Sequence, residues 1–253
     1  MRLTEIWGKP SSEILQEACL SEGMSCLDVG CGGGEVMGLM GELVGPAGKV
    51  TGLDIDGKIG REAVAKLKAT GNSNFEFVEG DMEKLDSVSN EKYDLTYARF
   101  LLSHIDDPIA ALRKMFEWTK PRGCIVIQDY DFRTIDVYPP TEITEEFKSV
   151  FFGVHERARR DLKIGHKIPH YFLQAGLGSP ERIHVQGLIQ TVAEASGMIQ
   201  SVYQSVLPFA VKSGVTTEEK GRSFVQRLKD LPTKDSCYIL WPLYVGAWKR
   251  KSV

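Results

Sequence analysis

The sequence has little that would place it in a membrane or in an oxidising compartment. Its longest apolar run, residues 239–248, is too short to cross a bilayer and contains Pro242. The first residues lack the apolar core of a signal peptide. Cys-x-x-Cys pairs and metal-ligand spacings are also missing, so we expect reduced cysteines, a cytoplasmic protein and no metal site. The five cysteines are Cys19, Cys26, Cys31, Cys124 and Cys237.

A strong excess of either charge is absent as well. The formal net charge is −3 at pH 7, which argues against a broad electrostatic surface for nucleic acid. The chain has 253 residues, of which 42% are hydrophobic and 26% charged, and this suits a soluble enzyme with one sizeable core. We therefore expect no nucleic-acid partner.

The stretch at residues 26–35 organises the chain. An apolar run that contains Asp28 ends in four glycines within five residues, Gly30, Gly32, Gly33 and Gly34. An amphipathic run over residues 36–44 follows, so the pattern predicts a strand, a glycine turn and a helix. Glycines permit the sharp reversal and let a ligand lie against bare backbone, and the new helix offers unpaired N–H groups there.

Two classes of ligand use such a turn. A dinucleotide site has the pattern Gly-x-Gly-x-x-Gly, with the pyrophosphate at the helix N-terminus. Gly30 and Gly32 fit this pattern, but Glu35 stands at the third glycine position and should repel a diphosphate. The residues therefore favour a zwitterionic or cationic ligand.

The motif Asp-Val-Gly-Cys-Gly-Gly-Gly resembles motif I of class I S-adenosylmethionine (SAM)-dependent methyltransferases. The resemblance implies SAM as the cofactor and S-adenosylhomocysteine (SAH) as the product. It also implies that the methionine part of SAM is held by Asp28, Gly30, Gly32 and Gly34.

Acidic residues follow the next two predicted strands. Asp54 and Ile55 end a strand over residues 49–55, and a carboxylate there suits vicinal ribose hydroxyls, because ligands bind at the carboxyl ends of parallel strands. A third strand over residues 74–79 leads to Asp81 and Met82, which the resemblance places beside adenine. Ile55 is expected to contact the cofactor with them.

The segment after the fourth predicted strand, residues 93–98, bears on the acceptor. It lacks the Pro-Pro-aromatic motif of enzymes that methylate amino groups of nucleic-acid bases or protein glutamine. Ala-Arg-Phe followed by His-Ile-Asp-Asp-Pro instead resembles the small-molecule branch, including the ubiquinone/menaquinone C-methyltransferase type. The resemblance implies that Arg99 lies near the methionyl end of SAM and that His104, a candidate general base, faces the transfer site.

The order of elements predicts an α/β fold with a doubly wound, seven-stranded Rossmann-like sheet. A helix is predicted over residues 10–20, helices over 58–70 and 108–118 follow, and the fifth strand spans 124–129. Strand six is predicted over residues 181–190 and strand seven, antiparallel to the rest, over 238–249. Helices over 192–207, closed by Pro208, and over 217–231 lie between them.

We expect a single methyltransferase domain over residues 1–253. Its SAM-binding core would span about residues 10–130 and 181–253. A helical substrate cap, about residues 131–180, would be inserted between strands five and six, with an aromatic loop at 130–140 and helices at 141–162 and 166–175.

Four residues are candidates for binding the acceptor. Trp7 lies on an arm before the first helix and is a candidate lid, although a simple packing anchor is the favoured interpretation. Tyr130 belongs to the aromatic loop, and His170 to the cap. Arg157, three residues before Arg160, is a candidate grip for an anionic acceptor, while a solvated helix face is the simpler interpretation.

The function expected is methyl transfer from SAM to a small-molecule acceptor by in-line displacement, in which the protein aligns the nucleophile and excludes water. Three alternatives stay open: a SAM-binding regulator without turnover, a methyltransferase for protein or RNA, and a nicotinamide-dependent oxidoreductase. Glu35 weighs against the last of these. The sequence does not identify the acceptor, the atom methylated or the oligomeric state.

Overall fold

The computed structural model describes residues 3–18, 20–71, 74–89, 92–229 and 237–252, with the backbone alone at 3–7 and 229. The chain forms two compact units. The first, called here the sheet unit, comprises Leu3–Tyr130, Ile164–Gln186 and the residues from Tyr244 onward. The second, called the helical unit, comprises Asp131–Lys163 and Gly187–Leu243.

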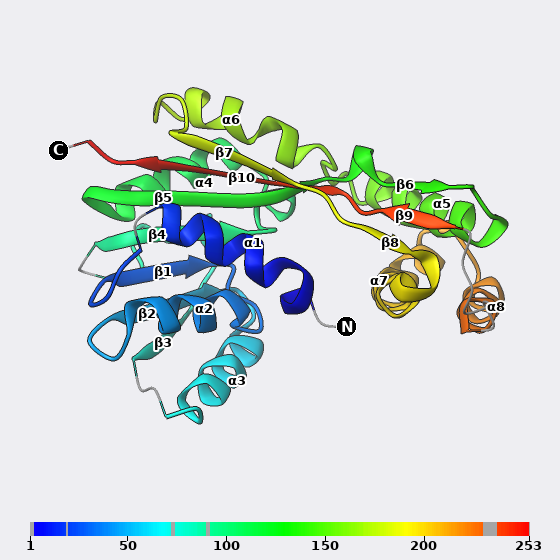
Figure 1. Ribbon diagram of the computed structural model, residues 1–253, viewed down its shortest axis with the longest axis horizontal. Helices are drawn as coiled ribbons and strands as arrows, with labels where there is room; N and C mark the ends of the chain where they lie inside the picture. The colour runs from blue at the N-terminus through cyan, green and yellow to red at the C-terminus, as the bar shows by residue number, and fades with distance from the viewer. Residues whose placement is uncertain (1–2, 19, 72–73, 90–91, 230–236, 253) are drawn as a thin grey trace. The chain divides into compact units, whose positions relative to one another are not determined.

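The sheet unit is built on a seven-stranded sheet with the order β3-β2-β1-β4-β5-β10-β7 (Figure 1). The first five strands pair in parallel, and β10 pairs with β7 in antiparallel fashion. The predicted doubly wound, mixed sheet with an antiparallel last strand is thereby confirmed. The strands are β1 (Ser25–Val29), β2 (Lys49–Asp54), β3 (Phe75–Glu79), β4 (Tyr93–Arg99), β5 (Thr119–Asp131), β7 (Arg182–Gln186) and β10 (Leu243–Arg250).

Helices cover both faces of this sheet because successive residues of its strands point to opposite sides. On β1, Leu27 and Val29 pack in one core with α4 and α6, whereas Cys26 packs in the other core with α1 and α2. Figure 1 shows these two layers. The helices of this unit are α1 (Leu3–Glu17), α2 (Glu35–Val44), α3 (Gly57–Lys68), the short η1 (Leu102–His104), α4 (Pro108–Trp118) and α6 (Ile164–Gln174).

The helical unit packs helices with a three-stranded sheet of order β6-β9-β8. Thr141 and Thr191 begin α5 and α7 with capping boxes, in which the threonine side chain and the third helical residue satisfy each other's backbone N–H groups. Tyr203 and Phe224 are buried and stack at 3.8 Å between ring centroids. The elements are η2 (Phe132–Thr134), β6 (Asp136–Tyr138), α5 (Glu142–Arg157), β8 (Ile189–Thr191), α7 (Val192–Lys212), α8 (Glu218–Lys229) and β9 (Tyr238–Leu240).

Proline misled the prediction of two helix ends. Helix α1 begins at Leu3 and passes through Pro10, so Trp7 lies within a helix and the predicted arm was wrong. Helix α7 likewise passes through Pro208 and ends at Lys212. Proline removes one N–H donor and disfavours a helix interior, but tertiary context tolerates it at both positions.

Strand and loop predictions differ from the structure between residues 130 and 190. The expected loop at 130–140 contains the end of β5, η2 and the strand β6. Strand six is divided into β7 and β8, which belong to different sheets. Helix α5 ends at Arg157, and Arg159 has a positive φ of 54°, so Arg157 and Arg160 do not share a helix face. The predicted end of the helix at 217–231 lies outside the described residues.

The division into units differs from the boundaries predicted for a cap. Helix α6 and residues 177–186 belong to the sheet unit, because α6 buries Ile168 and Phe172 in the core beneath the sheet. Residues 187–243 belong with 131–163 in the helical unit. The helical unit is therefore made of two separate parts of the chain.

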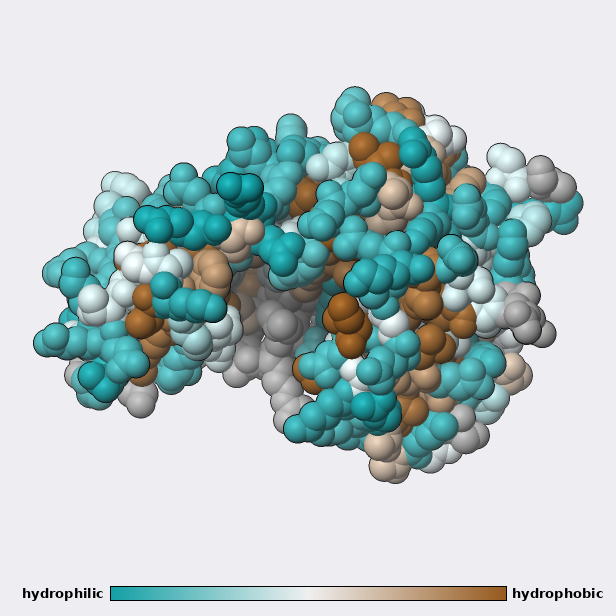
Figure 2. Space-filling view, turned by 180° about the vertical axis from the view of Figure 1, so that it is seen from behind, coloured by the Kyte–Doolittle hydropathy of each residue, from teal (hydrophilic) through white to brown (hydrophobic). Residues whose placement is uncertain are grey.

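The surface seen in Figure 2 is mostly hydrophilic, with separate hydrophobic patches. Across the described residues, no helix is long and apolar enough to span a membrane, and no cluster of His, Cys, Asp or Glu could hold a metal ion. The four cysteines in that part of the chain are buried and unbridged, as predicted, whereas Cys19 lies outside it.

Candidate functional site

The glycine turn after β1 has the conformation that its sequence predicts. Gly30, Gly32 and Gly34 have positive φ angles of 74°, 48° and 76°, which side chains resist. A Cβ atom at Gly34 would lie 2.9 Å from the Cβ of Ala63, so helix α3 excludes a side chain there. A Cβ at Gly32 or Gly33 would meet nothing within 4 Å. These two glycines thus expose bare backbone to open space.

Asp54, at the carboxyl end of β2, is hydrogen-bonded to the backbone of this turn. Its Oδ2 accepts a hydrogen bond of 2.8 Å from the N–H of Gly32, and its Oδ1 accepts one of 2.9 Å from the N–H of Asp56. A carboxylate has about four acceptor positions, so each oxygen keeps capacity for a ligand hydroxyl. The next side chain, Ile55, is 70% exposed, an unusual position for a large apolar group at a strand end. Asp56 caps α3, as predicted.

Asp28 and Arg99 place charges below the turn, on the neighbouring strands β1 and β4. Asp28 is buried, and the loss of hydration raises the pKa of its carboxyl to about 7, although Arg99 opposes that shift. Arg99 Nη2 donates to Glu35 Oε2 at 2.8 Å, and the Arg99 side chain is only 9% exposed. Glu35 is the first residue of α2, where the helix dipole favours an acid.

A buried network of hydroxyl groups lies beside Arg99. The hydroxyl of Tyr97 bonds the side chains of Gln128 and Ser11, and Ser11 Oγ lies 3.2 Å from the hydroxyl of Tyr244. Ser11 also lies 3.5 Å from Arg99 Nη1. Burial raises the pKa of Tyr97 to about 12, so its hydroxyl keeps its proton. This network joins α1, β4, β5 and β10 around the guanidinium.

Sequence reasoning missed both the network and the Glu35–Arg99 pair. The available signal was a set of polar residues inside otherwise apolar strands, Tyr97 and Gln128 among them. A buried polar group must find a partner, so these residues could have been marked as members of a network. Their partners could not be named, because they are up to 233 residues away in the chain.

Asp81 and Met82 form the turn after β3. The Asp81 carboxylate accepts a hydrogen bond from the N–H of Glu83 and pairs with Lys84 at 2.9 Å. The hydrogen bond from Lys84 and the one from Glu83 lower the pKa of Asp81. Met82 is buried in the core, and its carbonyl accepts a hydrogen bond from Lys114 Nζ, so this turn has a fixed shape.

Aromatic rings gather after the carboxyl end of β4. Phe100 has a positive φ of 57°, which is rare for a bulky residue and marks local strain. Its ring stacks on that of Tyr130 with 4.2 Å between centroids, and Tyr244 lies 5.7 Å from Tyr130. His104 is exposed at the end of η1. Tyr130 and Phe100 therefore form one partly exposed stack near Arg99, whose guanidinium lies 5.4 Å from the Phe100 ring.

The other three predicted acceptor-binding residues lie on three different helices. Trp7 lies in α1, but its side chain is outside the described part of the structure. His170 is exposed on α6 of the sheet unit. Arg157 is exposed in the helical unit, where its Nη1 donates to the carbonyl of Ser213 at 2.9 Å.

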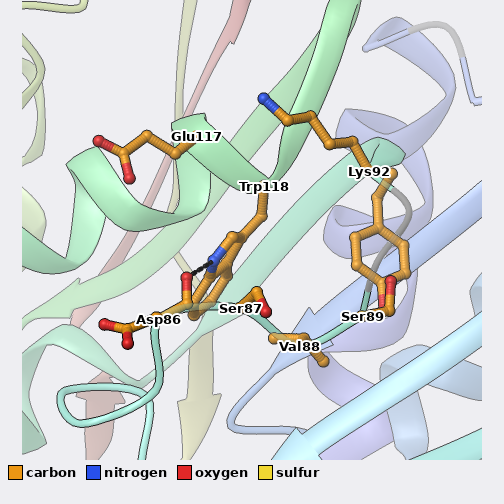
Figure 3. Close-up of a pocket in the computed structure, with 8 residues that line it drawn as sticks. Asp86, Ser87, Val88, Ser89, Lys92, Glu117 and Trp118 are labelled. Carbon is orange, nitrogen blue, oxygen red and sulfur yellow. Dashed lines mark hydrogen bonds between the residues drawn. The ribbon is translucent and has the colours of Figure 1, made fainter.

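A separate cavity of about 380 Å³ lies at the other end of β4 (Figure 3). Its lining includes Tyr93, which begins β4, and Trp118, which ends α4 and donates from Nε1 to the carbonyl of Asp86. Ligands of such sheets bind outside the carboxyl ends of the strands. This cavity is at the amino end, and it contains none of the predicted site residues.

Comparisons with known proteins agree with this geometry. The profile of a methyltransferase domain family matches residues 20–176. The demethylmenaquinone methyltransferase of Lactococcus lactis is 33% identical over 116 residues, which are 46% of this chain and 46% of that protein. The chain thus matches about half the length of such curated relatives.

Solved structures share the fold over nearly the whole chain. A putative methyltransferase from Bacillus halodurans has a TM-score of 0.63 and 19% identity, and the match covers 96% of this chain and 99% of that one. The [4+2]-cyclase SpnF has a TM-score of 0.57 and 15% identity over 97% of this chain and 81% of its own. At such identities the likeness shows the fold alone.

Proposed function

The chain belongs to the methyltransferase domain family, and from that membership we propose that it transfers a methyl group from SAM to a small-molecule acceptor. The observation that carries the proposal is the meeting of three strand ends at the glycine turn. There, Asp54 bonds the backbone of Gly32, and Arg99 pairs with Glu35. The name of the Lactococcus lactis relative supports a small-molecule acceptor.

The residues around the turn fit SAM. Gly30, Gly32 and Gly34 shape a backbone surface with open space above Gly32 and Gly33, where a ligand can approach closely. Asp54 has acceptor capacity left for ribose hydroxyls, and exposed Ile55 offers an apolar contact for the adenine ring. We assign Asp81 and the backbone of Met82 to the adenine edge. Asp28 and Arg99 are assigned to the methionyl group.

Bound SAM would supply a methyl group already activated by its sulfonium. The protein's own residues then have to align the acceptor and exclude water. The stack of Phe100 and Tyr130 is fixed beside Arg99 and offers a rigid apolar edge for that purpose. If the acceptor must lose a proton, His104 is the proposed general base, since it is exposed on η1 after the same strand.

Four residues are assigned to binding the acceptor. Tyr130 is the strongest of them because it lies with Phe100 and Tyr244. Trp7, His170 and Arg157 rest on the sequence alone. We further propose that the whole chain acts as one methyltransferase domain in the cytoplasm.

A second candidate function is SAM binding without methyl transfer. We keep this candidate because a fold does not fix a reaction: the cyclase SpnF, whose name describes a different reaction, shares the fold. Release of SAH from SAM in the presence of candidate acceptors separates the two functions, because only the methyltransferase produces it.

Calorimetric titration of the purified protein with SAM and with SAH tests the cofactor assignment. We expect binding in the micromolar range, weakened about 150-fold or more in Asp54→Ala, because two hydrogen bonds to a charged group are worth about 1.5–3 kcal/mol each, or at least about 3 kcal/mol together. Glu76→Ala is the matched control, since Glu76 pairs with Lys49 at the surface of the same sheet. Absence of binding to folded wild-type protein would reject the proposal, and equal weakening in both variants would reject the role of Asp54.

A further inference from the structure

The rim of the glycine turn carries more acidic groups than basic ones. This rim consists of Glu35, Asp54 and Arg99, of which Arg99 is the cation that pairs with Glu35. Asp28 is buried below the rim, where Arg99 acts on it, and it is not counted in the rim's charge because burial raises its pKa to about 7. The donors to Asp54 among the described residues are two backbone N–H groups, which carry no net charge. Because Glu35 neutralises the positive charge of Arg99, no positive charge from this pair is left to neutralise Asp54.

Glu35 controls this balance through its contact with Arg99. Its Oε2 lies 2.8 Å from Arg99 Nη2, and its side chain is 36% exposed at the first position of α2. The Arg99 guanidinium is nearly buried, so its charge acts strongly on anything bound nearby. Without Glu35, the positive charge of Arg99 would be unbalanced at the turn.

The proposed cofactor changes charge when it reacts. SAM carries a sulfonium, an ammonium and a carboxylate and has a net charge of about +1, whereas SAH has lost the sulfonium charge and is neutral overall. A rim with net negative charge stabilises bound SAM more than bound SAH. The same rim would disfavour a dinucleotide, whose diphosphate is anionic.

We propose that Glu35 is a specificity-determining residue that makes this site prefer SAM over SAH, by neutralising Arg99 and leaving the rim negatively charged. This inference rests on the proposed function. It assigns to Glu35 a consequence for the reaction cycle: product leaves more readily than substrate, so SAH inhibits the enzyme only weakly.

The ratio of the Kd of SAH to the Kd of SAM, measured by calorimetry, tests the inference. In Glu35→Gln we expect this ratio to fall about five- to tenfold, because SAM loses an electrostatic attraction that SAH does not have. Glu35→Asp keeps the charge and should retain most of the ratio. Glu42→Gln is the matched control, since Glu42 is exposed on the same helix and the charge change is identical; it should leave the ratio unchanged.

Two results would overturn the inference in different ways. Equal weakening of both ligands in Glu35→Gln would leave the cofactor site intact and show that Glu35 only positions Arg99. Failure of the wild-type protein to bind either ligand would reject the proposed function, and the inference with it. Thermal unfolding of each variant verifies that a change in the ratio of the two Kd values is not caused by loss of the folded state.

Discussion

The two units of the chain use polar residues in opposite ways. In the sheet unit, polar side chains that are distant in sequence meet: Ser11 and Tyr244 do so in the interior, and the nearly buried Arg99 pairs with the partly exposed Glu35. In the helical unit, the half-buried Lys148 pairs with Asp136 and Glu145, whose side chains are 71% and 54% exposed, and such solvent-facing pairs are worth little. Under the proposed function, the polar groups of the sheet unit are organised in advance to recognise a charged ligand, whereas the helical unit depends on apolar packing.

The largest expected effect tests whether apolar packing sustains the helical unit by itself. Phe224→Ala removes a fully buried ring that stacks on Tyr203, and we expect it to lower the free energy of unfolding by about 3–5 kcal/mol. In amide hydrogen exchange, α7 and α8 should lose protection while β1, β2 and β4 keep theirs.

Phe172→Ala is the matched control, because Phe172 is equally buried in the core of the sheet unit. It should reduce protection in α4 and α6. If both variants reduced protection uniformly over the whole chain, the two units would unfold as one. Their different use of polar residues would then not give them separate stabilities.

A buried carboxyl in the sheet unit should give a pH dependence that an exposed one does not. The pKa of Asp28 is raised to about 7, above its ordinary value, because burial disfavours its charged form. The folded state then keeps a proton that the unfolded chain releases, so the stability contributed by this group falls as pH rises from about 4 to about 7. Asp28→Asn removes that fall.

Urea unfolding at several pH values measures this effect. Relative to Asp28→Asn, the wild-type protein should lose up to about 1.4 kcal/mol for each pH unit within that window. Glu142→Gln is the control in the helical unit, since the side chain of Glu142 is 93% exposed, and its curve should run parallel to that of wild type. If the free energy of unfolding had the same pH dependence in all three proteins, the Asp28 carboxyl would ionise as easily in the folded state as in the unfolded chain.

The smallest effect is expected at Arg157 in the helical unit. Arg157→Ala removes one exposed hydrogen bond to Ser213, so the free energy of unfolding should fall by less than about 1 kcal/mol. The affinity for SAM, measured by calorimetry, should stay within about twofold of wild type. A marked loss of SAM affinity, restored by Arg157→Lys, would show that the charge of Arg157 acts on the cofactor and would contradict this expectation.

The sequence predicted elements best where local signals coincide. Asp107 and Pro108 mark a helix start, and α4 has the predicted bounds of 108–118, because a cap and a proline at the first position both favour that start. The glycine turn was predicted for the same reason. In each case neighbouring residues carry the information, so no distant contact is needed.

Prediction failed where distant contacts decide the structure. Strand six was predicted as one alternating run, but β7 pairs with β10 and β8 pairs with β9 in another sheet, so its division depends on partners far along the chain. The same limit applies to the site. Asp54 was assigned from its place after a glycine turn, whereas the pairing of Arg99 with Glu35 joins residues 64 positions apart.

The order of strands in the larger sheet has a consequence for biosynthesis. Strand β7 leaves the ribosome before β10, yet β10 lies between β5 and β7. The whole stretch of residues 187–242 must be translated before that gap can be filled. Until then, β5 has an unpaired edge and β7 lacks the neighbour that joins it to the sheet, and an unpaired edge invites wrong pairing. A nascent chain of this protein should therefore be most in need of chaperones during the synthesis of its helical unit.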